Sequence, residues 1–145
     1  MKRIRVFLAD DNRVVRMAFR KILEQEDDLE VVGEAKDGRQ AVAMVKRLCP
    51  EVVLMDVAMP VLNGFHATRE ILKTAPGTKV VMLSAHSDDA YVKEATHSGA
   101  MGYLIKQICV DDVCGAIREV QSGHTVYSPS IPRRLQKRSG KKQEH

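Results

Sequence analysis

A fivefold alternation of two kinds of segment constrains the fold of this chain more than any other feature. Short runs rich in β-branched residues predict strands, and each run is followed by a stretch with apolar residues at helical spacing. The predicted strands are residues 4–9, 29–35, 51–55, 79–84 and 101–105. Parallel strands are joined by crossover helices, so the alternation predicts a mostly parallel sheet with helices on both faces.

Polar residues gather where four of these strands end. The first strand runs into Asp10 and Asp11, the third into Asp56, the fourth into Ser84 and the fifth into Lys106. In an open parallel sheet, ligands bind outside the carboxyl ends of the strands, where the strand order reverses. A strand order of 2-1-3-4-5 would place the second strand at the edge and gather the other four around one crevice.

Three carboxylates in one crevice predict a site for a cation. Carboxylates that lie close together raise one another's pKa or require a positive ion between them. Oxygen ligands without His or Cys favour Mg²⁺. We expect Asp11 and Asp56 to bind the ion directly and Asp10 to act through water. The turn after the third strand is expected to add the backbone carbonyl of Ala58.

The remaining polar groups indicate phosphoryl transfer. Lys106 and Ser84 are expected on the other side of the crevice, as donors to anionic oxygens. A cation, an ammonium and a hydroxyl around a carboxylate suit phosphoryl transfer, with Asp56 as the nucleophile that becomes an acyl phosphate. Pro60 is expected to stiffen the following turn, and Gly64 to permit a close approach before the next helix.

Each of these residues alone has a plainer explanation. Asp10 and Asp11 could stabilise a helix dipole, Asp56 could be a turn acid, Ser84 a helix cap and Lys106 a surface lysine. Their joint occurrence at consecutive strand ends favours the shared site.

Four segments resemble the receiver domain of bacterial two-component response regulators. They are LADDN (8–12), LMDVAMPVLNG (54–64), MLSAH (82–86) and GYLIK (102–106). The resemblance implies a flavodoxin-like (βα)5 doubly wound parallel sheet and phosphotransfer from a sensor histidine kinase.

The resemblance also implies a role for each matching residue. Asp56 corresponds to the phosphoacceptor, Asp10 and Asp11 to the acid pair, and Ser84 and Lys106 to the switch hydroxyl and the lysine of the family.

Tyr103 matches the switch aromatic of the family, three residues before the lysine. In the family, the hydroxyl is drawn toward the phosphoryl group and the aromatic swings inward, which changes the surface of the fourth helix, fifth strand and fifth helix. The alternative is a half-buried strand aromatic. Gln107 stands where many members have proline, so no cis peptide is expected there. His86 either influences the water that attacks the acyl phosphate or is a solvated loop residue.

Two further segments, GAMGYLIK (99–106) and AIREVQSGHTVYSPSI (116–131), resemble the NarL/FixJ (LuxR-type) branch, whose members usually continue into a helix-turn-helix DNA-binding domain. Residues 131–145 are too few for that domain. We therefore expect a receiver domain at residues 1–130 and a basic flexible tail or linker at residues 131–145. The tail holds six basic residues and one acidic residue, whereas the rest of the chain holds 17 basic and 18 acidic residues.

The expected function is a non-enzymatic signalling module with three kinds of partner. These are a sensor histidine kinase, a downstream output protein or domain, and a second copy on phosphorylation. One alternative is the receiver part of a DNA-binding transcriptional regulator. Another is a phosphohydrolase with Asp56 as nucleophile, a class that usually needs a second acid where this chain has Ala58.

Composition predicts a cytoplasmic protein, because the chain shows no membrane-spanning run or signal peptide. The three cysteines are odd in number and lack zinc-like spacing, which favours structural burial over redox sensing.

Overall fold

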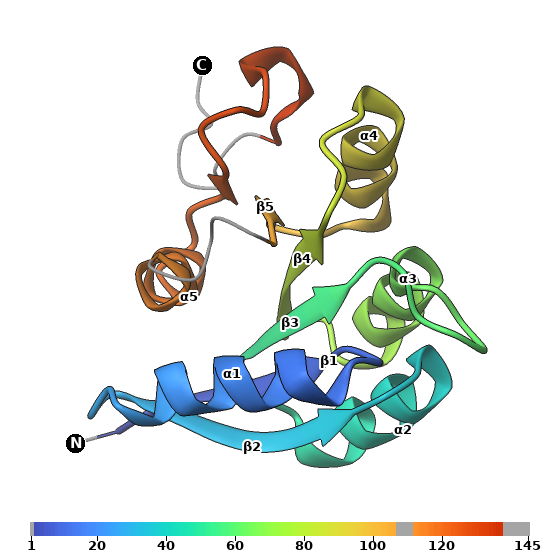
Figure 1. Cartoon of the computed structure of the whole chain (residues 1–145). Coiled ribbons are helices and arrows are strands. Elements are labelled where there is room, and N and C mark those ends of the chain that lie inside the picture. The colour runs from blue at the N-terminus through green and yellow to red at the C-terminus, as the bar shows by residue number, and fades with distance from the viewer. Residues whose placement is uncertain (1, 107–111, 138–145) are drawn as a thin grey trace.

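The computed structural model describes residues 2–106 and 112–137, which form a central parallel sheet between two layers of helices (Figure 1). The strands are β1 (Ile4–Ala9), β2 (Leu29–Ala35), β3 (Val52–Asp56), β4 (Lys79–Ser84), β5 (Gly102–Ile105) and β6 (Val126–Tyr127). The helices are α1 (Arg13–Glu24), α2 (Gly38–Leu48), α3 (Gly64–Thr74), α4 (Asp89–Ser98), α5 (Val113–Gln121) and the short 3-10 helix η1 (Arg133–Leu135).

The strand order is β2-β1-β3-β4-β5-β6, which confirms the predicted order of the first five strands. The sixth strand was not predicted. It pairs Val126 with Gly102 and Tyr127 with Tyr103, and two residues are too few to show an alternating pattern. A side chain at Gly102 would meet the Val126 carbonyl at 2.3 Å, so this glycine permits the close approach of β6.

Three helices begin at side-chain caps in the loops that follow β1, β2 and β3. Asn12, Asp37 and Asn63 each accept a hydrogen bond from the backbone N–H three residues later. Such caps satisfy amide groups that have no partner within the helix. They fix where α1, α2 and α3 begin, and so fix the loops at the carboxyl ends of β1, β2 and β3.

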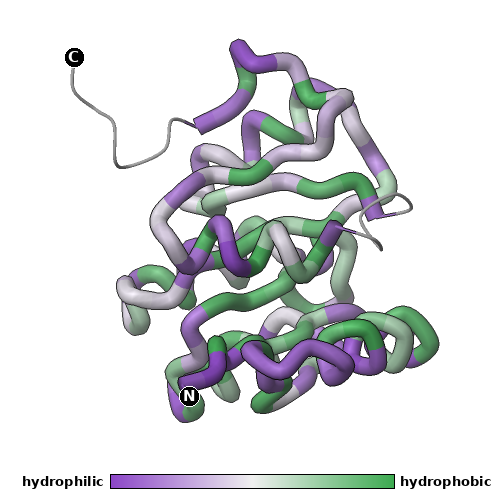
Figure 2. Tube along the Cα trace, turned by 90° about the vertical axis from the view of Figure 1, so that its left-hand side faces the viewer, coloured by the Kyte–Doolittle hydropathy of each residue, from purple (hydrophilic) through white to green (hydrophobic). Residues whose placement is uncertain are grey.

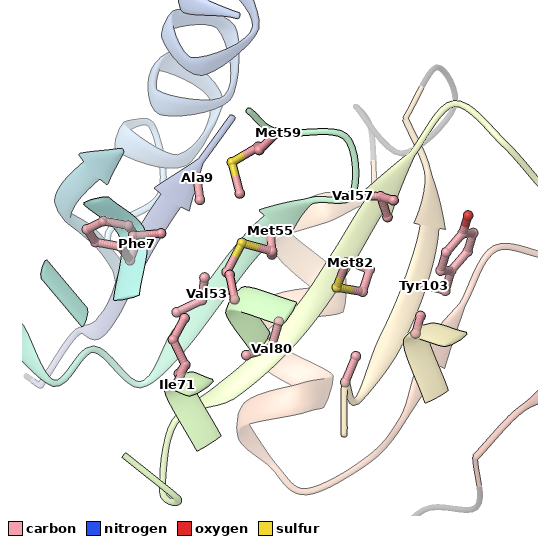
Figure 3. Close-up of a cluster of buried hydrophobic side chains, with 14 of the residues drawn as sticks. Phe7, Ala9, Val53, Met55, Val57, Met59, Ile71, Val80, Met82 and Tyr103 are labelled. Atoms are coloured by element: carbon pink, nitrogen blue, oxygen red, sulfur yellow. The ribbon is translucent and has the colours of Figure 1, made fainter. Parts of the chain in front are cut away.

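The core has two halves because the strands are covered on both faces. Phe7, Met55, Met82 and Tyr103 face α2, α3 and α4 in the larger cluster (Figure 3). The smaller cluster packs the alternate strand residues against α1 and α5. Figure 2 shows the resulting apolar stretches along the central strands and the mixed polar and apolar residues of the helices. Doubly covered strands are expected to be almost continuously apolar.

Residues 131–137, which were expected to lie in a flexible tail, pack against the domain. Ile131 and Leu135 are buried in the larger apolar cluster. The carbonyl of Leu135 accepts a hydrogen bond from Thr96 of α4 at 3.3 Å. The packed part of the chain therefore extends beyond the expected boundary at residue 130, and only residues 138–145 of the predicted tail lie outside the described residues.

The prediction of buried cysteines is wrong for Cys49. This residue is exposed and ends α2 in the left-handed conformation, with φ 49°. Cys114 is half-buried, whereas Cys109 and the peptide after Lys106 lie outside the described residues. Within residues 2–106 and 112–137, no helix is both long and apolar enough to cross a bilayer.

Val61, in the loop between β3 and α3, adopts a strained backbone conformation. Its φ is 70° and the residue is 77% exposed. The left-handed region is unfavourable for a β-branched residue. Val61→Gly should therefore raise the free energy of unfolding by about 1 kcal/mol, measured by urea denaturation. Val61→Ala retains the Cβ and should gain less. A less stable glycine variant would contradict this explanation.

Candidate functional site

The three predicted acids lie together at one end of the sheet. Carboxylate oxygens of Asp10, Asp11 and Asp56 are within 4.8 Å of one another. Asp10 and Asp56 are buried and Asp11 is exposed. The cause is topological, because β1 and β3 are adjacent parallel strands whose carboxyl ends lie side by side.

Lys106 reaches this cluster from β5, across the intervening strand β4. Its ammonium nitrogen lies 2.7 Å from Asp10 Oδ2 and 3.3 Å from Asp56 Oδ1. The backbone N–H of Lys106 donates to the Ser84 carbonyl at 2.7 Å, which fixes the residue at the end of the sheet. Burial disfavours the charged form of Lys106, but the two carboxylates outweigh it and raise the pKa of the amine.

The pKa of Asp56 is raised well above the ordinary value of an aspartate. Burial raises the pKa of its carboxyl to about 6, and the nearby charge of Asp10 contributes in the same direction. The Lys106 ammonium and the backbone N–H of Ala58 oppose this shift. A buried carboxylate beside another carboxylate is stabilised by a cation, and three carboxylates without His or Cys suit a hard divalent ion. The residues present therefore fit Mg²⁺.

The turn after Asp56 approaches the strand closely, as expected for Gly64. A Cβ at Gly64 would lie 2.3 Å from the backbone oxygen of Asp56. The N–H of Gly64 donates to the carbonyl of Val57 at 2.9 Å. Ala58 lies exposed within this turn, and the role of its carbonyl as a metal ligand stays a prediction.

Ser84, His86 and Tyr103 form a connected set of hydrogen bonds. The buried Ser84 hydroxyl accepts from the His86 N–H at 3.0 Å, and the Tyr103 hydroxyl donates to the His86 carbonyl at 2.6 Å. Tyr103 is completely buried rather than half-buried, and its role as the switch aromatic stays a prediction. Its ring lies among the core side chains (Figure 3), and burial raises the pKa of its hydroxyl. The imidazole of His86 packs on the ring of Tyr91 at 4.7 Å.

Arg16 belongs to the surroundings of the site and was missed in the sequence. Its Nη1 donates to the backbone carbonyl of Asp10 at 2.7 Å. The available indication was its position on α1, little more than one turn after the acid pair. Nothing in the sequence alone showed that Glu34 of the neighbouring strand β2 would hold its guanidinium.

Comparison with known proteins places this arrangement in a family. The family model of the response regulator receiver domain matches residues 6–118. The transcriptional regulatory protein DegU of Brevibacillus brevis is 36% identical over 133 residues, which cover 92% of this chain and 56% of DegU. The response regulator GacA of Pseudomonas aeruginosa is 35% identical over 142 residues, 98% of this chain and 66% of GacA. The chain thus spans little more than half the length of DegU.

Solved structures agree with the fold. The response regulator domain of Thermotoga maritima CheB matches with a TM-score of 0.79 and 33% identity, over 83% of this chain and 98% of that domain. A LuxR-family two-component response regulator from Aurantimonas sp. SI85-9A1 matches with a TM-score of 0.85 and 29% identity, over 90% of this chain and 93% of that chain. The predicted flavodoxin-like fold and the resemblance to NarL/LuxR-type receivers are confirmed.

The close approach at Gly64 can be tested by adding one methyl group. Gly64→Ala should lower the free energy of unfolding by about 2 kcal/mol, because its Cβ would clash with the Asp56 backbone oxygen. Gly77→Ala is the matched control, since a Cβ there meets nothing within 4 Å. Urea denaturation compares the two variants. Equal stability of the two variants would contradict this explanation, because it would show that the turn can accommodate the Cβ without loss of free energy.

The raised pKa of Asp56 predicts a pH-dependent stability in metal-free protein. As the pH falls from 7 toward 5, the folded protein binds a proton at Asp56, with a pKa of about 6, while the unfolded chain, at 3.8, does not. This group therefore stabilises the fold increasingly as the pH falls, and that contribution is lost as the pH rises through 6.

Asp56→Asn removes this buried charge. In EDTA at pH 7 the variant should be more stable than the wild type by about 1–3 kcal/mol, and the difference should shrink at pH 5. Denaturation at both pH values measures it. A difference that does not depend on pH would contradict the raised pKa.

Proposed function

Because the chain belongs to the family of response regulator receiver domains, we propose that it accepts a phosphoryl group on Asp56 from a sensor histidine kinase. We propose further that Mg²⁺ is required and that the modification changes a partner-binding surface. The observation that carries this proposal is the position of Asp56, which is buried with a raised pKa, lies beside Asp10 and Asp11, and is 3.3 Å from the ammonium of Lys106.

The transfer exchanges one covalent bond for another. A carboxylate oxygen of Asp56 attacks the phosphorus, an oxygen–phosphorus bond forms, and the phosphorus–nitrogen bond of the kinase phosphohistidine breaks. Asp10, Asp11 and Asp56 would hold Mg²⁺, with the Ala58 carbonyl as a further ligand. When bound, the ion supplies positive charge to the phosphoryl oxygens. Asp56 must be ionised to attack, and both the ion and Lys106 favour that form.

In this proposal, Lys106 exchanges one of its partners when Asp56 is phosphorylated. In the structure, its ammonium is paired with Asp10 and Asp56. After transfer, a phosphoryl oxygen on Asp56 would replace one carboxylate contact, so the lysine would stabilise the acyl phosphate with little movement.

The switch would start at Ser84. Its hydroxyl is bonded to the N–H of His86, and the carbonyl of His86 is bonded to Tyr103. A phosphoryl oxygen that draws the Ser84 hydroxyl toward Asp56 would therefore change the bonds of the same peptide segment that holds Tyr103. We propose that α4 and β5 carry the altered surface, because Tyr103 lies on β5 and His86 precedes α4.

The relatives favour a second proposal about the output. DegU is described as a transcriptional regulatory protein, and this chain covers 56% of it. We propose that the receiver controls a DNA-binding output domain or a separate output protein in the cytoplasm, with dimerisation on phosphorylation. A phosphohydrolase is disfavoured because Ala58 provides no second acid after Asp56.

Phosphoacceptor chemistry can be tested with acetyl phosphate and intact mass. The wild type should gain one phosphoryl group with Mg²⁺ and none in EDTA, and Asp56→Ala should gain none. Asp27→Ala, an exposed acid at the opposite end of the sheet, is the control and should react as the wild type does. Phosphoryl uptake by Asp56→Ala would defeat the assignment of the acceptor.

A further inference from the structure

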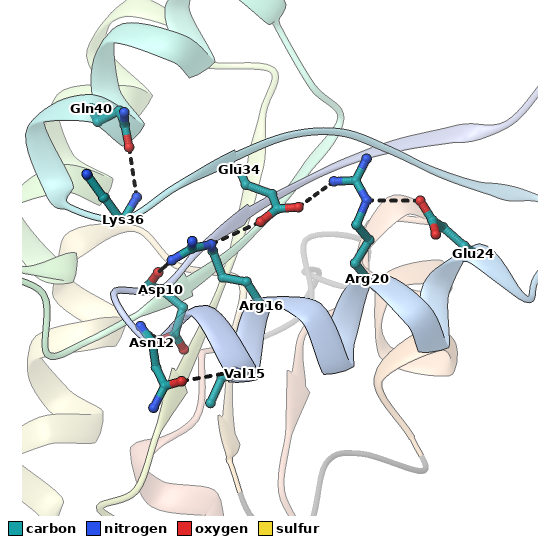
Figure 4. A network of polar contacts seen from close by, with 9 residues as sticks. All are labelled: Asp10, Asn12, Val15, Arg16, Arg20, Glu24, Glu34, Lys36 and Gln40. Atoms are coloured by element: carbon teal, nitrogen blue, oxygen red, sulfur yellow. Dashed lines mark hydrogen bonds and ion pairs between the residues drawn. The ribbon is translucent and has the colours of Figure 1, made fainter.

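Arg16 connects the acid pair to the edge of the sheet. Its Nη1 donates to the backbone carbonyl of Asp10 at 2.7 Å, and its Nε donates to Glu34 Oε1 at 3.0 Å. Figure 4 shows the guanidinium lying between these two groups. The Arg16 side chain is only 15% exposed, so the contact is largely shielded from water.

The bond from Arg16 completes the set of contacts around Asp10. The Asp10 N–H donates to the Ala35 carbonyl at 3.0 Å, just beyond the last paired residues of β1 and β2. The Asp10 carboxylate accepts from the Asn12 N–H at 2.8 Å and pairs with Lys106 at 2.7 Å. The carbonyl is the remaining polar group of this buried residue, and Arg16 is its partner.

This carbonyl belongs to the peptide that joins Asp10 to Asp11. A peptide unit is planar, so the direction of the Asp10 carbonyl also sets the direction of the Asp11 N–H. The carboxylate of exposed Asp11 forms no hydrogen bond with any other residue in the described ranges. Its placement toward the site therefore depends on the backbone that carries it, and Arg16 holds that backbone.

Glu34 in turn holds Arg16 in place. Its two carboxylate oxygens bind two arginines one helical turn apart on α1, with Arg16 on Oε1 and Arg20 on Oε2 at 2.5 Å. Arg20 also binds Glu24, but the described contacts do not join it to Asp10. Arg16 and Arg20 therefore share the ion pair to β2, and the bond to the site distinguishes them.

We propose that Arg16 is a positioning residue that orients the Asp10–Asp11 peptide and thereby sets the affinity of the acid pair for Mg²⁺. The inference rests on the proposed function of the acidic site. Removal of a residue that orients a metal ligand without binding the metal itself typically weakens metal binding by about 10- to 100-fold.

The direction in which the Mg²⁺ affinity changes when Arg16 is removed distinguishes a positioning role from a purely electrostatic one. The Arg16 guanidinium is positive, so by Coulomb repulsion alone its removal would tighten the binding of a cation. If Arg16 acts by holding the peptide, its removal weakens Mg²⁺ binding despite that gain. Arg16→Lys keeps the charge but loses the planar fork that serves two partners at once, so it should also weaken binding.

The experiment measures Mg²⁺ dissociation constants by calorimetry for the wild type, Arg16→Ala, Arg16→Lys and the control Arg20→Ala. Thermal melting in EDTA is recorded in parallel. Both alanine variants should melt earlier than the wild type, because each loses an ion pair to Glu34. The dissociation constant should rise about tenfold or more for Arg16→Ala, rise for Arg16→Lys, and stay unchanged for Arg20→Ala.

The outcomes distinguish this inference from the proposed function. Unchanged or tighter Mg²⁺ binding by Arg16→Ala, with normal binding by the wild type, overturns the positioning role and leaves the proposed function intact. If Arg16→Ala does not fold, Arg16→Lys decides, and wild-type affinity of that variant overturns the role. A wild type that binds no Mg²⁺ overturns the inference and the proposed function together.

Discussion

Negative charge held at the end of a covered sheet is the constraint on which the site depends. Asp10 and Asp56 are buried side by side because they follow and end β1 and β3, which are paired as neighbouring parallel strands. Lys106 compensates part of this charge from β5. The cost of an ionised Asp56 appears as its raised pKa, and that cost is also what makes the site favour a divalent cation. The expected affinity for a divalent cation and the instability of the metal-free site at neutral pH thus have one physical origin, the burial of an ionised Asp56.

Hydrogen bonds connect the neighbourhood of the site to the strands on the far side of β3. Ser84 lies on β4, adjacent to β3, and Tyr103 lies on β5. The backbone of His86 is bonded to the hydroxyls of both residues. A rearrangement near Asp56 therefore has a short route of two hydrogen bonds to a buried aromatic ring. Because the core around Tyr103 is closely packed, a shift of that ring requires its neighbours to repack rather than deform gradually.

The sequence predicts the central architecture well because strong local patterns agree with it. Apolar runs that end in Asp10, Asp56 and Lys106 are sufficient to infer the sheet and the gathering of charges at one end. What lies outside these patterns depends on contacts between distant residues. The two-residue strand β6 forms because Gly102 lets Val126 approach. Arg16 acts on the site only because Glu34 of β2 holds it, and helical periodicity contains no information about that partner.

The segment after α5 is the clearest case of a structure that the local sequence pattern did not predict. Its position also matters for the proposed switch. Its basic residues suggested a solvated tail, yet Ile131 and Leu135 lie in the apolar cluster that contains Tyr103. Ser128 also contacts β5 directly, because its N–H donates to the Tyr103 carbonyl and its hydroxyl accepts from the Ile105 N–H. Any repacking around Tyr103 must therefore be accommodated by the residues that follow α5. Ser128 is thus bonded directly to β5, so in the proposed switch a change at Tyr103 would reach this segment without first crossing an exposed surface.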